Sequence, residues 1–414
     1  MSDEAILFAN NLSYKLPIPS SVTVDRVLKR QYFQNTTYAQ NQTAVCTFNT
    51  GVDFVDCKNS ALVMKIKVNQ GPGAGLFYAS YGTGSGLNML RSMRIYHRTG
   101  ICYSNVQRIN LWSKIQQRYS ESSNWFNTVG KIMGYEQTPT AISNVLPGES
   151  DVLTVVIPLD KLHPFFDPSG GVFLPAVMAS GLRVELDLAD ISEALVIDPT
   201  TAENPSSYQI DQIYFETMNV TLQDSTQASL NTIASKVALE YVYRDVFTSQ
   251  NTAPSLTNAV NIDINKAVSY ADQVFAGVQD TASLNSIVTD SFDLDYRPSS
   301  WQFQLGSNYY PSSVRVDDDK IAYKNALLAF DKLKHTDKES QVQLADFNVT
   351  NGIYAVSLER DTALALSQTP INSSRSLRFE VTFDTPPADA ITTTVFLSYL
   401  TSARATLTSA RIDI

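Results

Sequence analysis

The sequence predicts an all-β protein built as two tandem β-sandwich domains, with a few short helices in the connections. Apolar residues alternate with polar ones along many short segments, which is the period of a half-buried β-strand. Clusters of Gly, Pro, Asn and Ser separate these segments, as turns separate strands. The 414 residues exceed the usual length of a single sandwich, so two domains are expected.

Three segments show this alternation most clearly, and each is expected to place its apolar side chains on one buried face. Charged or polar residues occupy most of the positions between them, so the opposite face is expected to meet solvent. The apolar sets are Leu62, Met64, Ile66 and Val68; Leu182, Val184, Leu186 and Leu188; and Leu377, Phe379, Val381 and Phe383.

Three helices are predicted, at residues 103–119, 224–235 and 318–333. In the first, apolar residues recur every three or four positions and form one face; they are Val106, Ile109, Trp112, Ile115 and Tyr119. The last has three aspartates at its start and lysines at its end, which suits the helix dipole; its apolar face comprises Tyr323, Leu327, Phe330 and Leu333. Asp224 is placed to cap the middle helix, with Gln227 three residues later as in a capping box.

The two halves of the chain resemble each other. Segments 182–188 and 377–383 share an apolar, basic, apolar, acidic, apolar order, and each precedes a closing strand, at 208–222 or 392–407. A predicted helix comes earlier in each half. The sequence therefore predicts a duplicated fold, divided into an N-terminal arm at 1–20, a first domain at 21–223, a helical linker at 224–236 and a second domain at 237–414.

Charge and cysteine content exclude several functions. The formal net charge of −10 argues against direct packaging of nucleic acid, because affinity for phosphates comes mostly from Lys and Arg. Cys46, Cys57 and Cys102 form neither a CxxC pair nor a zinc-type spacing, and buried apolar thiols are expected. The N-terminal segment does not read as a secretory signal, and no apolar stretch is long enough to span a bilayer. We expect a soluble protein made in a reducing compartment.

No catalytic, cofactor-binding or metal-binding residue is assigned from the sequence. His97, His163 and His335 are scattered over different elements, without the HxH pair of a cupin metal site. No serine lies in the GxSxG turn that would favour a Ser/His/Asp triad. The glycine-rich segments 71–75 and 82–86 lack the Gly-Lys-Ser/Thr ending of a phosphate loop, so they are expected to be strand connections.

Other conspicuous side chains have a structural interpretation. Residues 317–319, three aspartates, lack the spacing of an EF-hand loop and are expected to begin a helix, although a cation at a subunit interface stays open. Core or interface packing is expected for the aromatic cluster Trp301, Phe303, Tyr309 and Tyr310, since an acidic chain lacks the basic groove of single-strand binders. The N-terminal apolar residues either dock on a neighbouring protein or fold onto their own domain; they are Ile6, Leu7, Phe8, Leu12 and Leu16.

Several segments together resemble the double jelly-roll major capsid proteins of virophages and polinton-like viruses, and more distantly those of tectiviruses and adenoviruses. The resemblance covers roughly residues 20–414. In the first half it is carried by LRSMRIYHRTGIC (90–102), VVIPLDKLHPFF (155–166), LP (174–175) and GLRVEL (181–186); in the second half it is carried by SWQFQLGSNYYP (300–311) and INSSRSLRFE (371–380).

The resemblance implies two tandem eight-stranded antiparallel jelly rolls, a double jelly roll. It further implies a homotrimer that forms a pseudo-hexameric capsomer of an icosahedral shell around double-stranded DNA. The partners would be neighbouring capsomers, penton proteins and minor capsid or cement proteins; contact with an inner membrane stays open. The protein would be found in the virion capsid, after assembly in the cytoplasm or nucleus of the host cell. The family has no catalytic residues and no cofactors, so the resemblance assigns none to this chain.

Two other functions are compatible with a β-sandwich protein of this composition. A receptor- or carbohydrate-binding β-sandwich module is favoured by the many aromatic, Asn, Gln and Ser residues. A cupin-like or glycoside-processing enzyme shares the sandwich architecture but requires a metal cluster or paired carboxylates. The absence of such constellations from the sequence favours the shell protein.

Overall fold

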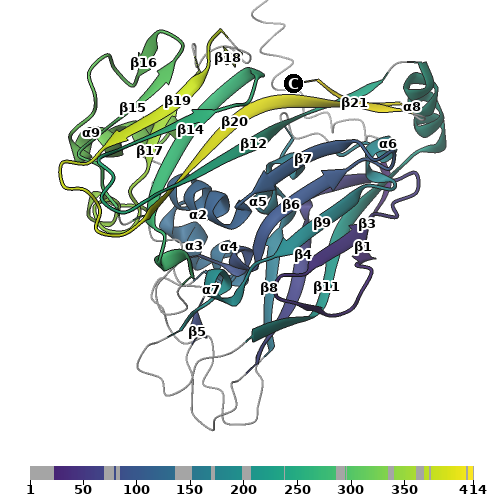
Figure 1. The fold of residues 1–414 in the computed structure, drawn as a ribbon. Helices are drawn as coiled ribbons and strands as arrows, with labels where there is room; N and C mark the ends of the chain where they lie inside the picture. The colour runs from purple at the N-terminus through teal and green to yellow at the C-terminus, as the bar shows by residue number, and fades with distance from the viewer. Residues whose placement is uncertain are drawn as a thin grey trace, which may run out of the picture.

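The computed structural model describes residues 23–69, 79–80, 84–135, 152–168, 173–197, 207–236, 238–285, 294, 296–333, 340–359, 368–372, 374–406 and 409–413. The predicted N-terminal arm at 1–20 lies outside them, as do His335 and the glycine segment 71–75. Within the described residues the chain forms two lobes that correspond to its two halves (Figure 1).

The first half contains two antiparallel sheets. The larger places its strands in the order β1-β11-β4-β8, with β2 also paired to β11, and the smaller has the order β3-β9-β6-β7. The larger sheet comprises β1 (Thr23–Tyr32), β2 (Tyr38–Ala39), β4 (Phe54–Asn69), β8 (Val152–Pro158) and β11 (Ser207–Leu222). The smaller comprises β3 (Thr43–Thr47), β6 (Leu90–Tyr96), β7 (Cys102–Gln107) and β9 (Arg183–Leu188). A short pair joins β5 (Ala79–Ser80) to β10 (Val196–Ile197).

The second half repeats this arrangement. Its larger sheet has the order β12-β20-β14-β17, with β18 paired to β14 and β21 paired to β20; its smaller sheet has the order β13-β19-β15-β16. The larger sheet comprises β12 (Leu239–Ala253), β14 (Val268–Asp280), β17 (Tyr354–Ser357), β18 (Thr369–Ile371), β20 (Ile391–Ala405) and β21 (Ala410–Asp413). The smaller comprises β13 (Ala259–Ile264), β15 (Ser300–Leu305), β16 (Asn308–Tyr310) and β19 (Leu377–Thr382).

The strand order identifies both halves as jelly rolls. When the eight main strands of either half are numbered along the chain, the larger sheet reads 1-8-3-6 and the smaller reads 2-7-4-5. Eight strands wound in this way into two facing sheets form a jelly roll. The predicted all-β fold and its duplication are therefore confirmed.

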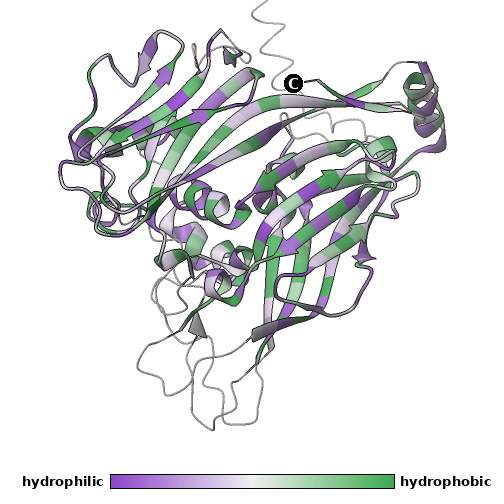
Figure 2. Cartoon of the chain, in the orientation of Figure 1, coloured by the Kyte–Doolittle hydropathy of each residue, from purple (hydrophilic) through white to green (hydrophobic). Residues whose placement is uncertain are grey.

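The alternation seen in the sequence builds the cores. Leu62, Met64 and Ile66 on β4 are completely buried, and so are Leu377 and Phe379 on β19. The intervening side chains, largely polar, point away from the core, so hydrophilic and hydrophobic positions alternate along the strands (Figure 2). All three predicted alternating segments lie in strands, and both predicted closing strands are present as β11 and β20.

The first predicted helix begins later than expected. Residues 102–107 form β7, and the helix α2 (Ile109–Ser120) follows. Pairing of β7 with β6 provides backbone hydrogen bonds that outweigh the helical spacing of Tyr103 and Val106. Arg108, with a left-handed φ of 55°, marks the change from strand to helix. The rest of the predicted apolar face is buried on α2 as expected.

The helix predicted at 318–333 is α9 (Asp319–Ala329), which is shorter than expected at its C-terminal end. Asp318 caps it as its position suggests, because its carboxylate accepts hydrogen bonds from the backbone of Lys320 (2.7 Å) and Ile321 (3.2 Å). The predicted apolar face is wrong in part: Leu333 lies beyond the helix and is 47% exposed. The buried residues of the helix are instead Ala322, Asn325 and Ala326.

The predicted linker helix is present as α8 (Asp224–Lys236), between the last strand of the first half and the first strand of the second. The side chain of Gln227 donates to Asn231, one turn further along the helix. The remaining helices are short: η1 (Gly86–Met89), α3 (Ser123–Asn127), α4 (Val129–Ile132), α5 (Leu159–Leu162), η2 (Pro164–Phe166), α6 (Ala176–Ala179), α7 (Ile191–Ala194), η3 (Ser283–Asn285) and α10 (Leu344–Phe347). Of the helices in the described ranges, none combines the length and the apolar character required to span a bilayer.

The core of the second jelly roll supplies a first prediction. Phe303 on β15 is fully buried, and its ring centroid lies 4.6 Å from that of Phe379. Phe303→Ala should lower the free energy of unfolding by about 3–5 kcal/mol, because it leaves a cavity. Tyr309→Ala, on the neighbouring strand at 43% exposure, is the control and should change it by less than about 1 kcal/mol. Urea unfolding followed by circular dichroism measures both, and equal losses would contradict the assignment of Phe303 to the core.

Candidate functional site: the junction between the jelly rolls and the exposed surfaces

The histidines that the structure describes make local hydrogen bonds. His97 lies with Nδ1 2.8 Å from the hydroxyl of Thr99 and Nε2 3.3 Å from the carbonyl oxygen of Val177. His163 is completely buried. In the described parts of the chain, no group of three or more His, Cys, Asp and Glu side chains is placed to hold a metal ion.

A serine, a histidine and an aspartate do meet, at the junction between the two jelly rolls. The hydroxyl of Ser104 on β7 donates to Asp245 on β12, and Nε2 of His163 lies 3.4 Å from the same hydroxyl. In a Ser/His/Asp triad the histidine stands between the other two, whereas here the serine does. All three side chains are also buried. The geometry is that of a structural hydrogen-bond network.

The network continues into both halves. Nδ1 of His163 accepts a hydrogen bond from the backbone of Phe165 (3.1 Å), so the neutral ring carries its hydrogen on Nε2. The second carboxylate oxygen of Asp245 accepts from the hydroxyl of Tyr399 (2.7 Å). Burial raises the pKa of Asp245, and the hydrogen bonds from Ser104 and Tyr399 offset part of that rise. Burial also lowers the pKa of His163, to about 3.

Aromatic side chains of β12 fill the rest of this contact. The ring of Phe165 lies 5.3 Å from that of Tyr241 and 4.8 Å from that of Tyr243. The hydroxyl of Tyr241 donates to the carbonyl of Phe165 (2.8 Å), and that of Tyr243 donates to the carbonyl of Tyr103 (2.5 Å). The strand β12 therefore lies against β7 and η2, as Figure 1 shows for β12 and β7.

A second contact joins the halves through α2, which lies between the two lobes (Figure 1). Tyr119 is buried, and its hydroxyl donates to the carbonyl of Asn351 (2.7 Å) while its ring stacks on Phe330 at 5.2 Å. The backbone carbonyl of Arg118 accepts from the amide of Gln341 (3.1 Å). Two separate contacts of this kind resist rotation of one lobe against the other.

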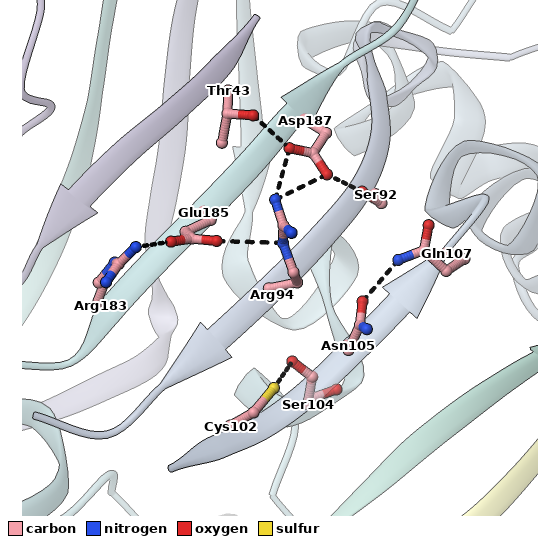
Figure 3. Close-up of polar contacts among 10 residues, drawn as sticks. All are labelled: Thr43, Ser92, Arg94, Cys102, Ser104, Asn105, Gln107, Arg183, Glu185 and Asp187. Carbon is pink, nitrogen blue, oxygen red and sulfur yellow. Dashed lines mark hydrogen bonds and ion pairs between the residues drawn. The ribbon is translucent and has the colours of Figure 1, made fainter. Parts of the chain in front are cut away.

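Charged residues of the strand β9 form an ion-pair network across the smaller sheet of the first half (Figure 3). Arg94 on β6 donates to both carboxylate oxygens of Asp187, at 2.8 and 3.1 Å, and its Nε lies 3.2 Å from Glu185. Arg183 pairs with Glu185 as well, and Thr43 donates to Asp187 (2.6 Å). The charged positions of segment 182–188 thus tie together three neighbouring strands.

The matching segment of the second half uses its charges in the same way. Arg378 on β19 pairs with Asp263 on β13 at 2.6 Å, and Glu380 on β19 pairs with Arg315 at 2.9 Å. The sequence similarity between segments 182–188 and 377–383 therefore reflects equivalent strands whose charged side chains form ion pairs, with partners at different positions in the two halves.

The edge strand β1 presents the most open surface of the first jelly roll. Its first eight residues are all exposed, and they include apolar side chains: Val24 is 66% and Leu28 55% exposed. Tyr32, at the end of the strand, is 64% exposed. Lys29 pairs with Asp53 at 2.8 Å. Val24, Leu28 and Tyr32 share one face of the strand with Arg26 and Arg30. Exposed apolar side chains on an edge strand are typical of a surface that another chain covers.

The remaining residues singled out in the sequence have local roles. Asp318 caps α9 and Asp319 pairs with Arg297 at 2.9 Å, which accounts for two of the three consecutive aspartates. Trp301 and Phe303 are buried in the core of the second jelly roll, as expected, whereas Tyr309 is exposed. Cys46 and Cys57 are buried thiols as predicted, and Cys102 is partly exposed.

The similarity of this chain to known proteins lies in its fold. No protein-family model and no curated protein sequence matches the chain. Solved structures match nearly its whole length. The PBCV-1 virus capsid superposes with a TM-score of 0.65 at 11% identity, over 97% of this chain and 99% of that one. The chain has a double jelly-roll capsid-protein fold.

Two further structures have the same fold. The Faustovirus major capsid protein gives a TM-score of 0.65 at 8% identity, over 96% of this chain and 94% of that one. The mavirus major capsid protein gives 0.54 at 8% identity, over 97% and 92%. The resemblance to virophage capsid proteins predicted from the sequence is confirmed at the level of the double jelly roll.

The buried His163 gives the double jelly roll a pH-dependent stability. The unfolded histidine has a pKa of about 6.5 and the folded one about 3, so between these values only the unfolded chain binds the proton. The contribution of His163 is therefore present above pH 6.5 and is lost as pH falls, by up to about 1.4 kcal/mol per pH unit. Asp245 has the opposite sign, because its folded pKa is raised.

His163→Asn, whose side-chain oxygen can still accept from Phe165, should remove this part of the pH dependence. Urea unfolding of both proteins at pH 7, 6 and 5 tests it, with the stability of the variant falling less steeply. His97 remains in both proteins, so the difference isolates His163. Parallel curves would show that His163 does not cause the acid sensitivity.

Arg94 should matter more to stability than Arg378, a more exposed arginine of the second half. Its partner Glu185 has a side chain only 8% exposed, whereas Arg378 and its partner Asp263 are 43% and 53% exposed. Arg94→Met should lower the free energy of unfolding by about 1–3 kcal/mol, because Glu185 loses a partner in a poorly solvated position. Arg378→Met should cost less than about 1 kcal/mol. Chemical unfolding of the two variants that gave the reverse order would refute this difference.

Proposed function

We propose that this protein is a major capsid protein, a structural subunit that forms a viral shell. The observation that carries the proposal is that two jelly rolls of identical strand order occur in one chain, and that this pair matches capsid proteins over more than nine-tenths of both chains. The PBCV-1 structure is a virus capsid, and the Faustovirus and mavirus structures are major capsid proteins.

The proposed assembly is a homotrimer. Three copies of a chain with two similar lobes place six lobes around a threefold axis, which gives a pseudo-hexameric capsomer. The junction contacts support this, because the two lobes of each chain keep a constant relation. The exposed apolar side chains of β1, at Val24, Leu28 and Tyr32, support contact with a neighbouring chain. Division of the chain into domains at 21–223 and 237–414, with α8 between them, follows the separation of the sheets.

The proposed role is structural and not enzymatic. The Ser104, His163 and Asp245 cluster is buried and has the wrong order for a triad. The net charge of −10 favours a shell that does not bind the genome through its phosphates. In this proposal the capsomers form an icosahedral shell around double-stranded DNA, located in the virion and assembled inside the host cell. The partners would be neighbouring capsomers, penton proteins and minor capsid or cement proteins.

Size and shape of the purified protein test the proposal. Light scattering after size exclusion should give a mass three times that of the 45.7 kDa chain, and negative-stain images should show six-lobed tiles. A stable monomer at micromolar concentration that does not assemble at any salt concentration or pH would contradict it. Specific micromolar binding on a glycan array, without tiles, would favour a carbohydrate-binding module instead.

A further inference from the structure

A cavity of about 610 Å³ lies at the junction of the two jelly rolls, next to the contact made by α2. Its walls come from both halves of the chain, with Trp112 and Lys161 on one side and Arg244 and Phe330 on the other. This volume lies within the range of about 300–1,000 Å³ that is usual for small-molecule sites. It is separate from the buried Ser104 network, whose residues do not line it.

The lining is strongly acidic. Among the residues that the structure describes, two basic side chains line the cavity, and each has a carboxylate partner: Lys161 pairs with Glu121 at 2.6 Å, and Arg244 pairs with Asp272 at 2.7 Å. The six carboxyl groups of the lining are divided equally between the two halves; they are Glu121, Asp160, Asp167, Asp272, Asp331 and Glu359. The described lining thus has more acidic than basic side chains, which favours a cationic ligand.

Two hydrogen-bond acceptors in the wall lack a partner. Asp272 is 5% exposed; one of its carboxylate oxygens binds Arg244, and the other, Oδ1, accepts no hydrogen bond. Gln117 is 3% exposed and its side-chain oxygen is likewise unpaired, although its nitrogen donates to the carbonyl of Lys161. Buried polar atoms normally have partners. These two acceptors, one from each half, indicate a donor that completes the site.

The same cavity also has apolar walls. Trp112 and Phe330 are each 8% exposed, and Leu328 lines the space beside them. A bare metal ion gains nothing from such walls, and no described residues form a metal-binding group. A flexible chain with positive ends and methylene groups between them matches both features, because its methylenes pack on the rings and its ends meet carboxylates.

We infer that this cavity binds a linear polyamine, with one ammonium group donating to Asp272 Oδ1 and Gln117 Oε1 and another held by the carboxylates of the first half near Asp160. The inference does not depend on the proposed capsid function, since the site lies within a single chain. Bound polyamine would join the two lobes through ion pairs and hydrogen bonds, and so would stabilise the junction.

Calorimetric titration of the full chain with spermidine tests the inference. Saturable binding with one site per chain is expected, together with a rise in melting temperature greater than that given by NaCl at equal ionic strength. MgCl₂ alone should not reproduce this rise. Absence of binding up to millimolar spermidine, or an equal effect of MgCl₂, would overturn the inference.

Matched variants locate the site. Asp272→Asn should weaken spermidine binding at least tenfold. Asp263→Asn removes the same charge from an exposed aspartate that also pairs with an arginine, at 2.6 Å, and should leave the affinity unchanged. Asp160→Asn provides a second test should Asp272→Asn fail to fold, because the ion pair of Asp160 with Lys161 is long, at 3.9 Å. Equal affinity in all variants would show non-specific binding to an acidic protein.

A further titration separates a free polyamine from a basic segment of another protein. The peptide acetyl-Lys-Gly-Lys-amide carries two primary ammonium groups, like the two ends of spermidine, on a polypeptide backbone. Spermidine should bind more tightly, because its methylene chain can pack on the apolar walls without burying the backbone amides that the peptide carries. Tighter binding of the peptide, sensitive to Asp272→Asn, would overturn the polyamine assignment in favour of a protein ligand.

Discussion

The burial of β12 against the first jelly roll is the interaction on which the rest of the molecule depends. Two jelly rolls in one chain make a two-lobed unit only when they hold a constant relative position. Tyr241 and Tyr243 provide this, because each places a ring on Phe165 and satisfies a carbonyl of the first half. Asp245 is buried between Ser104 and Tyr399. It constrains the orientation of the contact, because a buried carboxylate requires its hydrogen-bond partners in place.

The two halves achieve the same topology with different residues but the same distribution of polarity. Apolar side chains face the space between the sheets, while charges on β9 and β19 pair with neighbouring strands on the outside. Hydrogen bonds within each sheet pair the backbone amide and carbonyl groups. The outer faces therefore require only neutral polar side chains and a few ion pairs. Neutral polar outer faces suit close side-to-side packing of many copies, as the proposed shell function requires.

The parts of the fold that depend on local pattern could be predicted from the sequence, and the junction could not. Alternation located β4, β9 and β19, and Asp318 marked the start of α9. The segment of β7 is predicted as helix because Tyr103 and Val106 have a helical spacing of three residues, and the pairing with β6 that makes it a strand is not evident from the local pattern. Ser104, His163 and Asp245 lie far apart in the sequence, so nothing in their local context indicates that they meet. The acidic cavity is lined by both halves, so it could not be predicted from the sequence either.

The junction is expected to hold the two jelly rolls as one rigid unit. Spin labels at two exposed positions, Val52 in the first half (60% exposed) and Val314 in the second (73% exposed), measure this directly by pulsed electron resonance, after Cys102 is replaced by serine. A single narrow distance between the labels within one chain, unchanged by Asp263→Asn, is the predicted result. A broad distribution would show that the lobes move independently, and the account of the junction would be wrong.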